Sequence, residues 1–326
     1  MPKTLVTYPL PTPRLKDFCE KWDGVVVPKG TTVDEAFLMR EGAGCEALVT
    51  LLNHPVTRRV LEACPRLRVV ANAAAGFDNV DVAAARGRGV FVTNTPGVLD
   101  RATADLTWAL ILACCRRVVE ADRFLREGRF HGWEPDLLLG MDLNGKVLGV
   151  VGMGRIGTEV ARRAGAFGMK VAYHGPTAAP PPFPAEAMDL DALLGAADVL
   201  TLHVPLTPST RGLLDRRRLM RMKPGAVLIN TSRGAVVDEG ALAELLASGR
   251  LRAAGLDVYE REPAVHPGLM GLSNAVLLPH IGSAGEETRR TMADWALENA
   301  GRVLGGGAPL TNVWPLDTLS PFVKNP

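Results

Sequence analysis

Short apolar runs alternate with polar, helix-like segments along the whole chain. In the first hundred residues the runs are LVTYPL, GVVVP, ALVTLL, LRVVANAA and GVFVTN, with segments such as RLKDFCEKW and TRRVLEAC between them. A second series contains KVLGVVG, KVAYH, DVLTLHVP, AVLINTS, RAAGLDV and AVLLPH. Strands that alternate with helices at this spacing form parallel sheets covered by helices on both faces. The pattern therefore predicts an α/β chain with doubly wound parallel sheets.

Two longer helical segments, about 102–129 and 286–304, flank the second series. Helix breakers and caps stand where both segments begin, so we expect the chain to cross between domains there. The expected arrangement is a cofactor-binding domain of residues 102–285 inserted into a domain made of residues 1–101 and 286–326. The length of 326 residues agrees with two domains, at roughly 100–200 residues each.

Composition and charge exclude several classes of protein. The chain is 47% hydrophobic and 22% charged, and its formal charge of +2 is too balanced for a protein that neutralises nucleic-acid phosphates. The longest apolar run, residues 106–115, is far shorter than the ~20 residues of a membrane span, and the N-terminus lacks a leader pattern. No HExxH or CxxC spacing indicates a metal site. We expect a cytoplasmic protein that binds neither nucleic acid nor membranes.

A glycine turn follows the first strand of the second series. In VVGMGRIGTEV, Gly152 permits a tight turn, Gly154 lets the backbone approach a pyrophosphate, and Gly157 allows the helix to pack on the strand. The helix N-terminus supplies N–H donors for phosphate. Arg155 can add a charge-assisted contact, or lie in solvent. A glycine-rich turn without a ligand is the alternative, but the preceding strand and following helix are the context of a dinucleotide site.

Three polar residues with catalytic chemistry follow later strands. Arg233 follows AVLINTS, Glu262 follows AAGLDVYER, and His280 ends AVLLPH. Taken singly, each has a plain alternative: a loop arginine, an exposed glutamate and a capping histidine. Together they suit the reduction of a keto acid, because a guanidinium holds a carboxylate in a bidentate contact and an imidazole beside a carboxylate can protonate a carbonyl oxygen. The hydride must come from a cofactor.

Four motifs together make the sequence resemble the D-2-hydroxyacid dehydrogenase family: GMGRIG, INTSRGAVVDEGAL, AAGLDVYEREP and LLPHIGSA. NAAAGFDNVDV, VTNTPGVLDRATADL and the run from HGWEP to GMGRIG are most similar to its glyoxylate/hydroxypyruvate reductases. The resemblance implies a Rossmann domain inserted into a flavodoxin-like substrate domain, and NAD(P)H-dependent reduction of a 2-keto acid to a D-2-hydroxy acid. It also implies a homodimer formed by the cofactor domains. The helix around Trp108 and Leu110, which has more apolar surface than one domain needs, agrees with a homodimer.

The resemblance also implies roles for individual residues. Arg233 would bind the substrate carboxylate and carbonyl, His280 would be the general acid/base, and Glu262 would pair with it. Ala75 and Gly76 would offer N–H groups to the carboxylate across the interdomain cleft, with a plain tight turn as the alternative. Trp133 would reach the neighbouring subunit's substrate pocket, with burial in the core as the alternative.

The residues expected to contact the cofactor lie in the glycine turn and near the ends of other elements. Asp257 would lie near the nicotinamide amide, whereas His203 could equally be a core residue. The full set is Thr103, Gly152, Met153, Gly154, Arg155, Ile156, Gly157, His174, Gly175, Thr177, His203, Pro205, Thr231, Ser232, Asp257 and Gly282.

The end of the strand KVAYH bears on which nicotinamide cofactor is used. NAD-specific sites place an acidic residue about 20 residues after the glycine turn, where it binds the ribose 2′-hydroxyl and repels a 2′-phosphate. Here that place is His174, and no acidic residue follows until Glu186. His174 and the Thr177 hydroxyl can serve a phosphate. We therefore expect NADP(H) to be favoured and NAD(H) to be possible.

Three other functions are alternatives for this sequence. A D-3-phosphoglycerate dehydrogenase would need a phosphate pocket and commonly has additional regulatory domains, which 326 residues do not accommodate. A 2-ketogluconate-type dehydrogenase is a further alternative. A dinucleotide-sensing co-repressor of the same fold also keeps the three catalytic residues but would bind its ligand without steady turnover.

Overall fold

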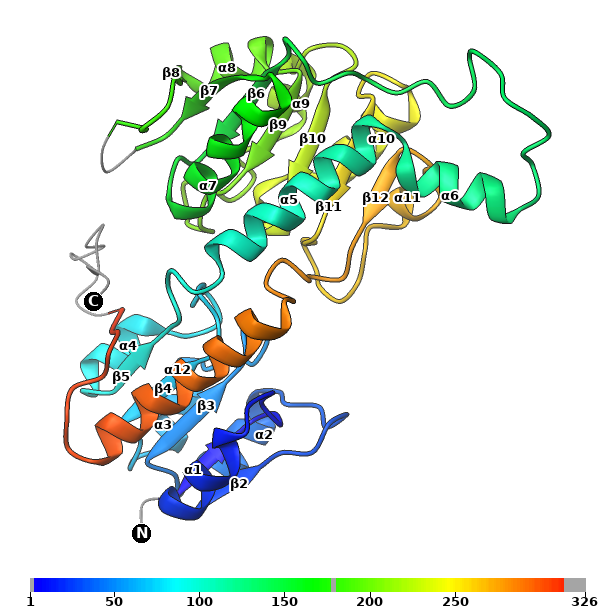
Figure 1. The fold of residues 1–326 in the computed structure, drawn as a ribbon. Coiled ribbons are helices and arrows are strands. Elements are labelled where there is room, and N and C mark those ends of the chain that lie inside the picture. Colours follow the sequence, from blue (N-terminus) through cyan, green and yellow to red (C-terminus); the bar gives the residue numbers. More distant parts are fainter. Residues whose placement is uncertain (1–2, 177–179, 314–326) are drawn as a thin grey trace. The chain divides into compact units, whose positions relative to one another are not determined.

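The protein is described from a computed structural model, which covers residues 3–176 and 180–313. The chain divides into two compact units (Figure 1). Unit 2 is Asp100–Gly282, and unit 1 consists of the chain up to Leu99 together with the chain from Ser283 onward. Unit 2 is thus inserted into unit 1.

The sheet of unit 1 is parallel and has five strands in the order β2-β1-β3-β4-β5. This is the flavodoxin-like order that the resemblance implies. Each apolar run of the first series forms one strand, as predicted. The strands are β1 (Thr4–Val6), β2 (Gly24–Val26), β3 (Ala47–Thr50), β4 (Val69–Asn72) and β5 (Phe91–Thr93).

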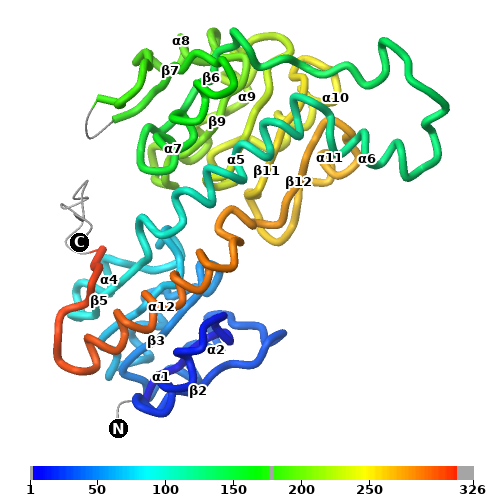
Figure 2. Tube along the Cα trace, in the orientation of Figure 1, coloured from blue at the N-terminus to red at the C-terminus, as the bar shows by residue number. Residues whose placement is uncertain are grey.

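Helices cover both faces of this sheet because successive strand residues point to opposite sides. Leu5 and Leu48 pack with α2, α3 and α4, whereas Val6 and Val49 pack with α1 and α12. Figure 2 traces α12 in orange alongside β3, with which it packs. The helices are α1 (Arg14–Trp22), α2 (Glu35–Gly42), α3 (Arg58–Ala63), α4 (Val82–Gly87) and α12 (Glu286–Leu304).

The sheet of unit 2 is parallel and has seven strands in the order β12-β11-β10-β9-β6-β7-β8. This is a Rossmann order, with its topological switch point between β6 and β9. The two-residue edge strand β8 was not predicted, since it is too short to have a periodic pattern. The strands are β6 (Val147–Val151), β7 (Lys170–His174), β8 (Glu186–Ala187), β9 (Val199–Leu202), β10 (Val227–Asn230), β11 (Ala253–Leu256) and β12 (Ala275–Leu277).

Two apolar cores lie on the two faces of this sheet. One contains side chains of α5 and α7, and the other contains side chains of α8, α9, α10 and α11. The elements are α5 (Asp100–Cys115), α6 (Val118–Arg126), α7 (Arg155–Ala164), the 3₁₀ turn η1 (Gly165–Phe167), α8 (Leu190–Ala196), α9 (Arg216–Arg221), the 3₁₀ turn η2 (Gly234–Val236), α10 (Glu239–Ala247) and α11 (Pro267–Met270). Across residues 3–176 and 180–313, no helix combines the length and apolar character that a membrane crossing requires.

The single helix predicted over about 102–129 is wrong, because the chain turns between α5 and α6. Arg117 has a left-handed φ of 53° and binds Glu120 at 2.7 Å. The carbonyl of Cys115 accepts the N–H of Met141 at 2.7 Å, so the returning chain packs against the end of α5. This long-range contact is what ends α5, and no local pattern encodes it.

The prediction of an excess apolar face on the helix around Trp108 is also wrong. Trp108 is only 4% exposed, its indole N–H donates to the carbonyl of Val160 at 3.0 Å, and its ring stacks on Phe167. Leu110 is buried in the same core. Several exposed apolar side chains lie instead on α6, which buries none of its residues, and on the chain after it: Val118, Val119, Leu125, Phe130, Trp133 and Leu139. We call residues 118–139 the apolar arm.

Candidate active site

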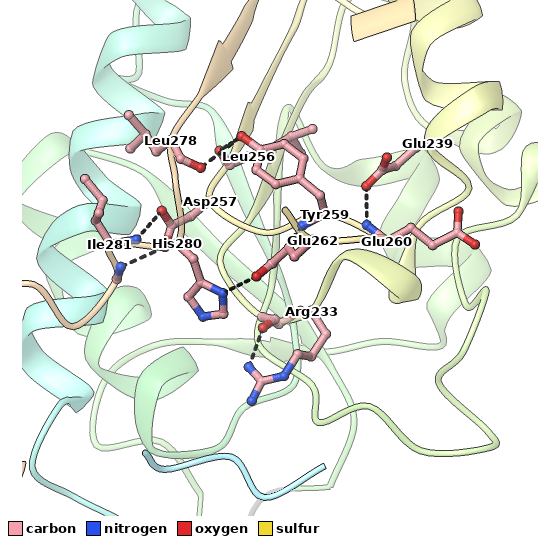
Figure 3. A network of polar contacts seen from close by, with 12 residues as sticks. Arg233, Glu239, Leu256, Asp257, Tyr259, Glu260, Glu262, Leu278, His280 and Ile281 are labelled. Carbon is pink, nitrogen blue, oxygen red and sulfur yellow. Dashed lines mark hydrogen bonds and ion pairs between the residues drawn. The ribbon is translucent and has the colours of Figure 1, made fainter. Parts of the chain in front are cut away.

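His280 and Glu262 form a hydrogen-bonded pair in unit 2. They follow β12 and β11, adjacent strands whose carboxyl ends meet at one sheet edge. His280 Nδ1 lies 2.8 Å from Glu262 Oε2 (Figure 3). Both side chains are partly exposed, so small molecules can reach them. Because Nδ1 faces the carboxylate, Nε2 is the ring nitrogen available to a substrate.

The electrostatics of Glu262 favour its charged form. Burial raises the pKa of this carboxyl, but the hydrogen bond and charge of His280, the N–H of Tyr259 and the charge of Arg233 together lower it below its ordinary value. Glu262 is therefore an anion at neutral pH. Its hydrogen bond to the imidazole gives the pair the arrangement of a general acid/base.

The backbone at His280 is held by Asp257. His280 has a left-handed φ of 54°, which is uncommon for a residue with a side chain. The buried Asp257 carboxylate accepts the next two backbone N–H groups, those of Ile281 and Gly282, each at 2.7 Å. Burial raises the pKa of Asp257, and these two hydrogen bonds partly offset that effect. Asp257 thus anchors the loop on which His280 stands.

The turn that carries Glu262 has its own anchors. Glu262 Oε1 accepts the N–H of Tyr259 at 3.0 Å, and the N–H of Glu260 donates to Glu239 Oε1 at 2.5 Å. The Tyr259 hydroxyl donates to the carbonyls of Leu256 and Leu278 in the segments of β11 and β12. Burial raises the pKa of Tyr259 to about 12, so its hydroxyl stays protonated at neutral pH.

Arg233 lies on the turn after β10, and that turn packs against the Glu262 turn. Asn230 fixes it: its Oδ1 accepts the N–H of Ser232 at 3.0 Å and its Nδ2 donates to the carbonyl of Arg233 at 3.0 Å. A Cβ on Gly234 would lie 1.8 Å from the carbonyl carbon of Tyr259, so only glycine permits this close approach. Arg233, Glu262 and His280 therefore lie together in unit 2 (Figure 3).

The glycine turn after β6 has the geometry of a dinucleotide site. Gly152 has a φ of 96°, and its Cβ would lie 2.7 Å from the carbonyl oxygen of His203. A Cβ on Gly157 would lie 2.1 Å from the carbonyl oxygen of Gly152, so the helix approaches the strand closely. A Cβ on Gly154 would meet no atom within 4 Å, and Gly154 caps α7 without a side-chain hydrogen bond. The space beside Gly154 and the first N–H groups of α7 fit a pyrophosphate.

The remaining residues expected at the cofactor lie near this turn or near the catalytic pair. Met153 is buried, Arg155 is exposed, and Ile156 is half-buried at the start of α7. His203 Nε2 lies 2.9 Å from the Thr201 hydroxyl, and burial lowers the pKa of His203 to about 3. His203 thus follows β9 with a neutral ring, and its backbone carbonyl lies beside Gly152.

Hydrogen bonds of the Thr107 hydroxyl connect α5 with the residue that follows β10. Thr107 Oγ1 donates to the carbonyl of Thr103 at 2.8 Å and lies 3.0 Å from Thr231 Oγ1. Gly282 faces Thr103, since a Cβ on this glycine would lie 3.5 Å from the threonine methyl. The buried Ser232 hydroxyl donates to Asn230, and the Pro205 carbonyl accepts from Thr210. These contacts hold the segments around Thr103, Thr231 and Ser232 in place.

His174 ends β7 with a fixed ring orientation. Its Nδ1 lies 3.0 Å from the carbonyl oxygen of Met188 and must therefore donate to it, which leaves Nε2 as the acceptor of the neutral ring. Gly175 follows with a φ of 112°. Thr177, the other residue expected at a 2′-phosphate, lies outside the described residues.

Ala75 and Gly76 form a turn of unit 1 whose carbonyl groups are hydrogen-bonded. Asn94 Nδ2 donates to the carbonyl of Ala75 at 2.7 Å, and Asn72 Nδ2 donates to that of Gly76 at 2.8 Å. Within residues 3–176 and 180–313, the N–H groups of Ala75 and Gly76 have no hydrogen-bond acceptor. Trp133, with 82% of its surface exposed, is not the core residue of the alternative interpretation.

Comparisons with known proteins establish the family. Residues 108–282 match the model of the "D-isomer specific 2-hydroxyacid dehydrogenase, NAD binding domain". The chain belongs to the D-isomer-specific 2-hydroxyacid dehydrogenases. Members of this family are NAD(P)-dependent oxidoreductases, so the chain is an enzyme that uses a nicotinamide dinucleotide and acts on the keto acid/hydroxy acid couple.

Individual relatives match almost the whole chain. A glyoxylate reductase of Thermococcus litoralis is 45% identical, over 91% of this chain and 92% of the relative. The crystal structure of a Thermus thermophilus protein superposes with a TM-score of 0.90 at 48% identity, covering 95% of this chain and 99% of that one. An NADPH-dependent glyoxylate/hydroxypyruvate reductase from Sinorhizobium meliloti, solved with NADP and malonate, gives a TM-score of 0.86 at 34% identity over 100% and 99% of the chains.

Sequence reasoning did not single out the residues of this dehydrogenase that hold the loops in place. Asn230 ends an apolar strand, as His280 nearly does, and that position could have indicated it. Tyr259 and Glu239 carry no such signal, because a tyrosine in a loop and an acid in the first turn of a helix are ordinary surface residues. Only the fold brings Glu239 to the turn that contains Tyr259 and Glu262.

Proposed function

We propose that this dehydrogenase reduces glyoxylate and hydroxypyruvate to the corresponding 2-hydroxy acids, with NADPH favoured. Arg233 holds the substrate carboxylate and polarises the carbonyl in a bidentate contact. His280 donates the proton from Nε2 to the carbonyl oxygen, and Glu262 stabilises the protonated ring. A nicotinamide cofactor held at the glycine turn would supply the hydride for the carbonyl carbon. The observation that carries this proposal is the 2.8 Å contact between His280 and Glu262 in the same cluster as Arg233.

The names of the relatives and the backbone N–H groups of Ala75 and Gly76 support the substrate class. Relatives at 40–46% identity are named glyoxylate reductases. The N–H groups of Ala75 and Gly76, whose carbonyls are held by Asn94 and Asn72, are assigned to the substrate carboxylate. This carboxylate contact and that of Arg233 suit a short 2-keto acid.

The cofactor-binding residues are assigned from the glycine turn and the strand ends around it. The pyrophosphate is assigned to Gly154 and Arg155, and the 2′-phosphate to His174. The open space at Gly154 and the absence of an acidic residue before Glu186 support these assignments. The other residues assigned to the cofactor are Thr103, Gly152, Met153, Ile156, Gly157, Gly175, Thr177, His203, Pro205, Thr231, Ser232, Asp257 and Gly282.

We also assign a homodimer, with the apolar arm as its interface. The face of α5 is buried within unit 2, but the apolar arm exposes Leu125, Phe130 and Trp133 at 61%, 49% and 82% of their surfaces. A group of large exposed apolar side chains on one segment is typical of an interface. We assign a second copy of this chain as its partner, with Trp133 reaching the substrate pocket of that copy.

A substrate panel with both cofactors tests the proposed function. Steady oxidation of NADPH is expected with glyoxylate and hydroxypyruvate, followed by the absorbance of the reduced nicotinamide. Higher kcat/KM with 2-ketogluconate or 3-phosphohydroxypyruvate would assign the enzyme to those substrates instead. NADPH binding without turnover on any of the four acids would contradict the proposal and favour the co-repressor-like alternative.

A further inference from the structure

A buried carboxylate that does not belong to the catalytic cluster lies beneath the Glu262 turn. Glu239 is the first residue of α10 and is 5% exposed. Its Oε1 accepts the N–H of Glu260 at 2.5 Å (Figure 3). Burial raises the pKa of Glu239, and the backbone N–H groups of Glu260 and His266 partly offset that effect.

Capping of α10 does not explain this placement. Asp238, the preceding residue, already caps the helix by accepting the N–H of Ala241 at 2.9 Å. Burying a carboxylate costs free energy unless hydrogen bonds compensate, and an acid in the first turn of a helix could simply lie in solvent. The burial of Glu239 is therefore explained by its contact with the turn of residues 259–262.

That turn connects Glu239 to the acid–base pair. Consecutive N–H groups, those of Tyr259 and Glu260, are bound by Glu262 Oε1 and Glu239 Oε1. Glu262 then presents its other oxygen to His280. Gly234, on the Arg233 turn, packs against the peptide unit between Tyr259 and Glu260. A displacement of Glu260 would thus move the N–H that orients the Glu262 carboxylate.

We propose that Glu239 is a positioning residue for proton transfer, which holds the turn of residues 259–262 so that Glu262 stays aligned with His280. The inference rests on the proposed roles of Glu262 and His280. In this role Glu239 acts as a hydrogen-bond acceptor at the right distance from Glu260, and its negative charge is not required.

The charges around the turn agree with a role of Glu239 as a hydrogen-bond acceptor. Glu239 faces Glu260 and His266, and Glu262 faces His280 and Arg233. Asp257 lies close enough to both His280 and Glu262 to interact with their charges. The negative charge beside the imidazole thus comes from Glu262 and Asp257 without Glu239.

Two substitutions of Glu239 distinguish the effect of its side-chain length from the effect of its charge. Glu239→Gln keeps an acceptor oxygen at the same length but removes the charge, whereas Glu239→Asp keeps the charge but is one methylene too short to reach Glu260. We expect Glu239→Asp to lower kcat for glyoxylate reduction by about 10- to 100-fold, because small misplacements of catalytic groups have effects of this size. Glu239→Gln should stay close to the unmodified enzyme.

The pH profile of kcat distinguishes positioning from loss of stability. In Glu239→Asp the alkaline limb should move to lower pH, since an imidazole without an aligned carboxylate loses its proton more readily. Asp238→Ala is the matched control: it removes the cap of the same helix and lowers the melting temperature, but should keep kcat and the pH profile. The proposal is overturned if Glu239→Asp behaves like this control, or if Glu239→Gln loses activity while Glu239→Asp keeps it.

A third variant covers the case in which Glu239→Asp does not fold. Glu239→Met has nearly the length of glutamate, packs in a buried place and lacks the acceptor, so it should show the same loss of kcat; a folded variant with full kcat overturns the proposal. His280→Ala and Glu262→Gln belong in the same assay. If both keep the full rate, the proposed function is wrong, whereas if both lose it and Glu239→Asp and Glu239→Met do not, only the role of Glu239 is wrong.

Discussion

His280 Nδ1 lies 2.8 Å from Glu262 Oε2, so the imidazole has one nitrogen on a carboxylate and the other available to a substrate. Replacing His280 with Ala removes the proton donor without changing the glycine turn. We expect kcat to fall by about 10²- to 10⁴-fold, the usual contribution of a positioned acid or base. The Kd for NADPH, measured by fluorescence titration, should hardly change. An unaltered kcat would place the proton donor elsewhere.

Arg233 stands on a turn fixed by Asn230, and its fork-shaped head suits a carboxylate and its adjacent carbonyl. Arg233→Lys keeps the charge but not the bidentate geometry. We expect KM for glyoxylate to rise and kcat to fall together, since the contact with the carboxylate is made in the ground state and the contact with the carbonyl oxygen strengthens in the transition state. Initial rates across a glyoxylate series measure both constants. Arg211→Lys, on an exposed loop of the same unit, is the control, and equal kinetics in the two variants would assign the carboxylate to other groups.

The apolar arm predicts the oligomeric state. Leu125→Asp combined with Phe130→Asp places charges on its exposed apolar surface, and we expect this variant to sediment as a monomer where the unmodified chain sediments as a dimer. Val25→Asp, at a 49% exposed position on unit 1, should remain a dimer. A monomeric unmodified chain at micromolar concentration would contradict both the dimer and the role of Trp133 in a neighbouring site.

The buried His54 predicts how stability depends on pH. Its Nδ1 lies 2.7 Å from the Thr7 hydroxyl and accepts the N–H of Leu51 at 3.4 Å, and burial lowers its pKa to about 4. Between that value and the ordinary 6.5, the unfolded chain binds a proton that the folded chain does not. The free energy of unfolding should therefore fall as the pH is lowered through this window, by about 3 kcal/mol from His54.

Melting temperatures between pH 4 and 7 measure this dependence. His54→Asn cannot titrate and should flatten the slope, whereas His131→Asn, at an exposed position, should leave the slope unchanged. His203, whose pKa burial lowers to about 3, adds a slope of the same sign, so some dependence should remain in His54→Asn. Identical slopes in the His54 variant and the unmodified chain would show that His54 is not the group that titrates.

The sequence was sufficient to predict the strands of both sheets other than β8, because buried parallel strands are continuous apolar runs with clear ends. It also indicated Arg233, Glu262 and His280, whose positions after such strands bring them to one sheet edge. The turn between α5 and α6 could not be predicted, since the contact between Cys115 and Met141 that ends α5 is long-range. Nor could the burial of Glu239, because its partner Glu260 lies 21 residues away.

The end of β7 predicts the choice of nicotinamide. His174 occupies the place of the acidic residue that binds the ribose 2′-hydroxyl in NAD-specific sites, so no carboxylate there repels a 2′-phosphate. Its Nδ1 donates to the carbonyl of Met188, so Nε2 is the ring nitrogen left for a phosphate. We expect kcat/KM to favour NADPH over NADH by about 10-fold, or one to two kcal/mol. His174→Asp should reverse the preference, whereas His174→Asn should leave a small one. Measuring kcat/KM for both cofactors tests this, and a strong preference of the unmodified enzyme for NADH would show that another acidic residue binds the ribose.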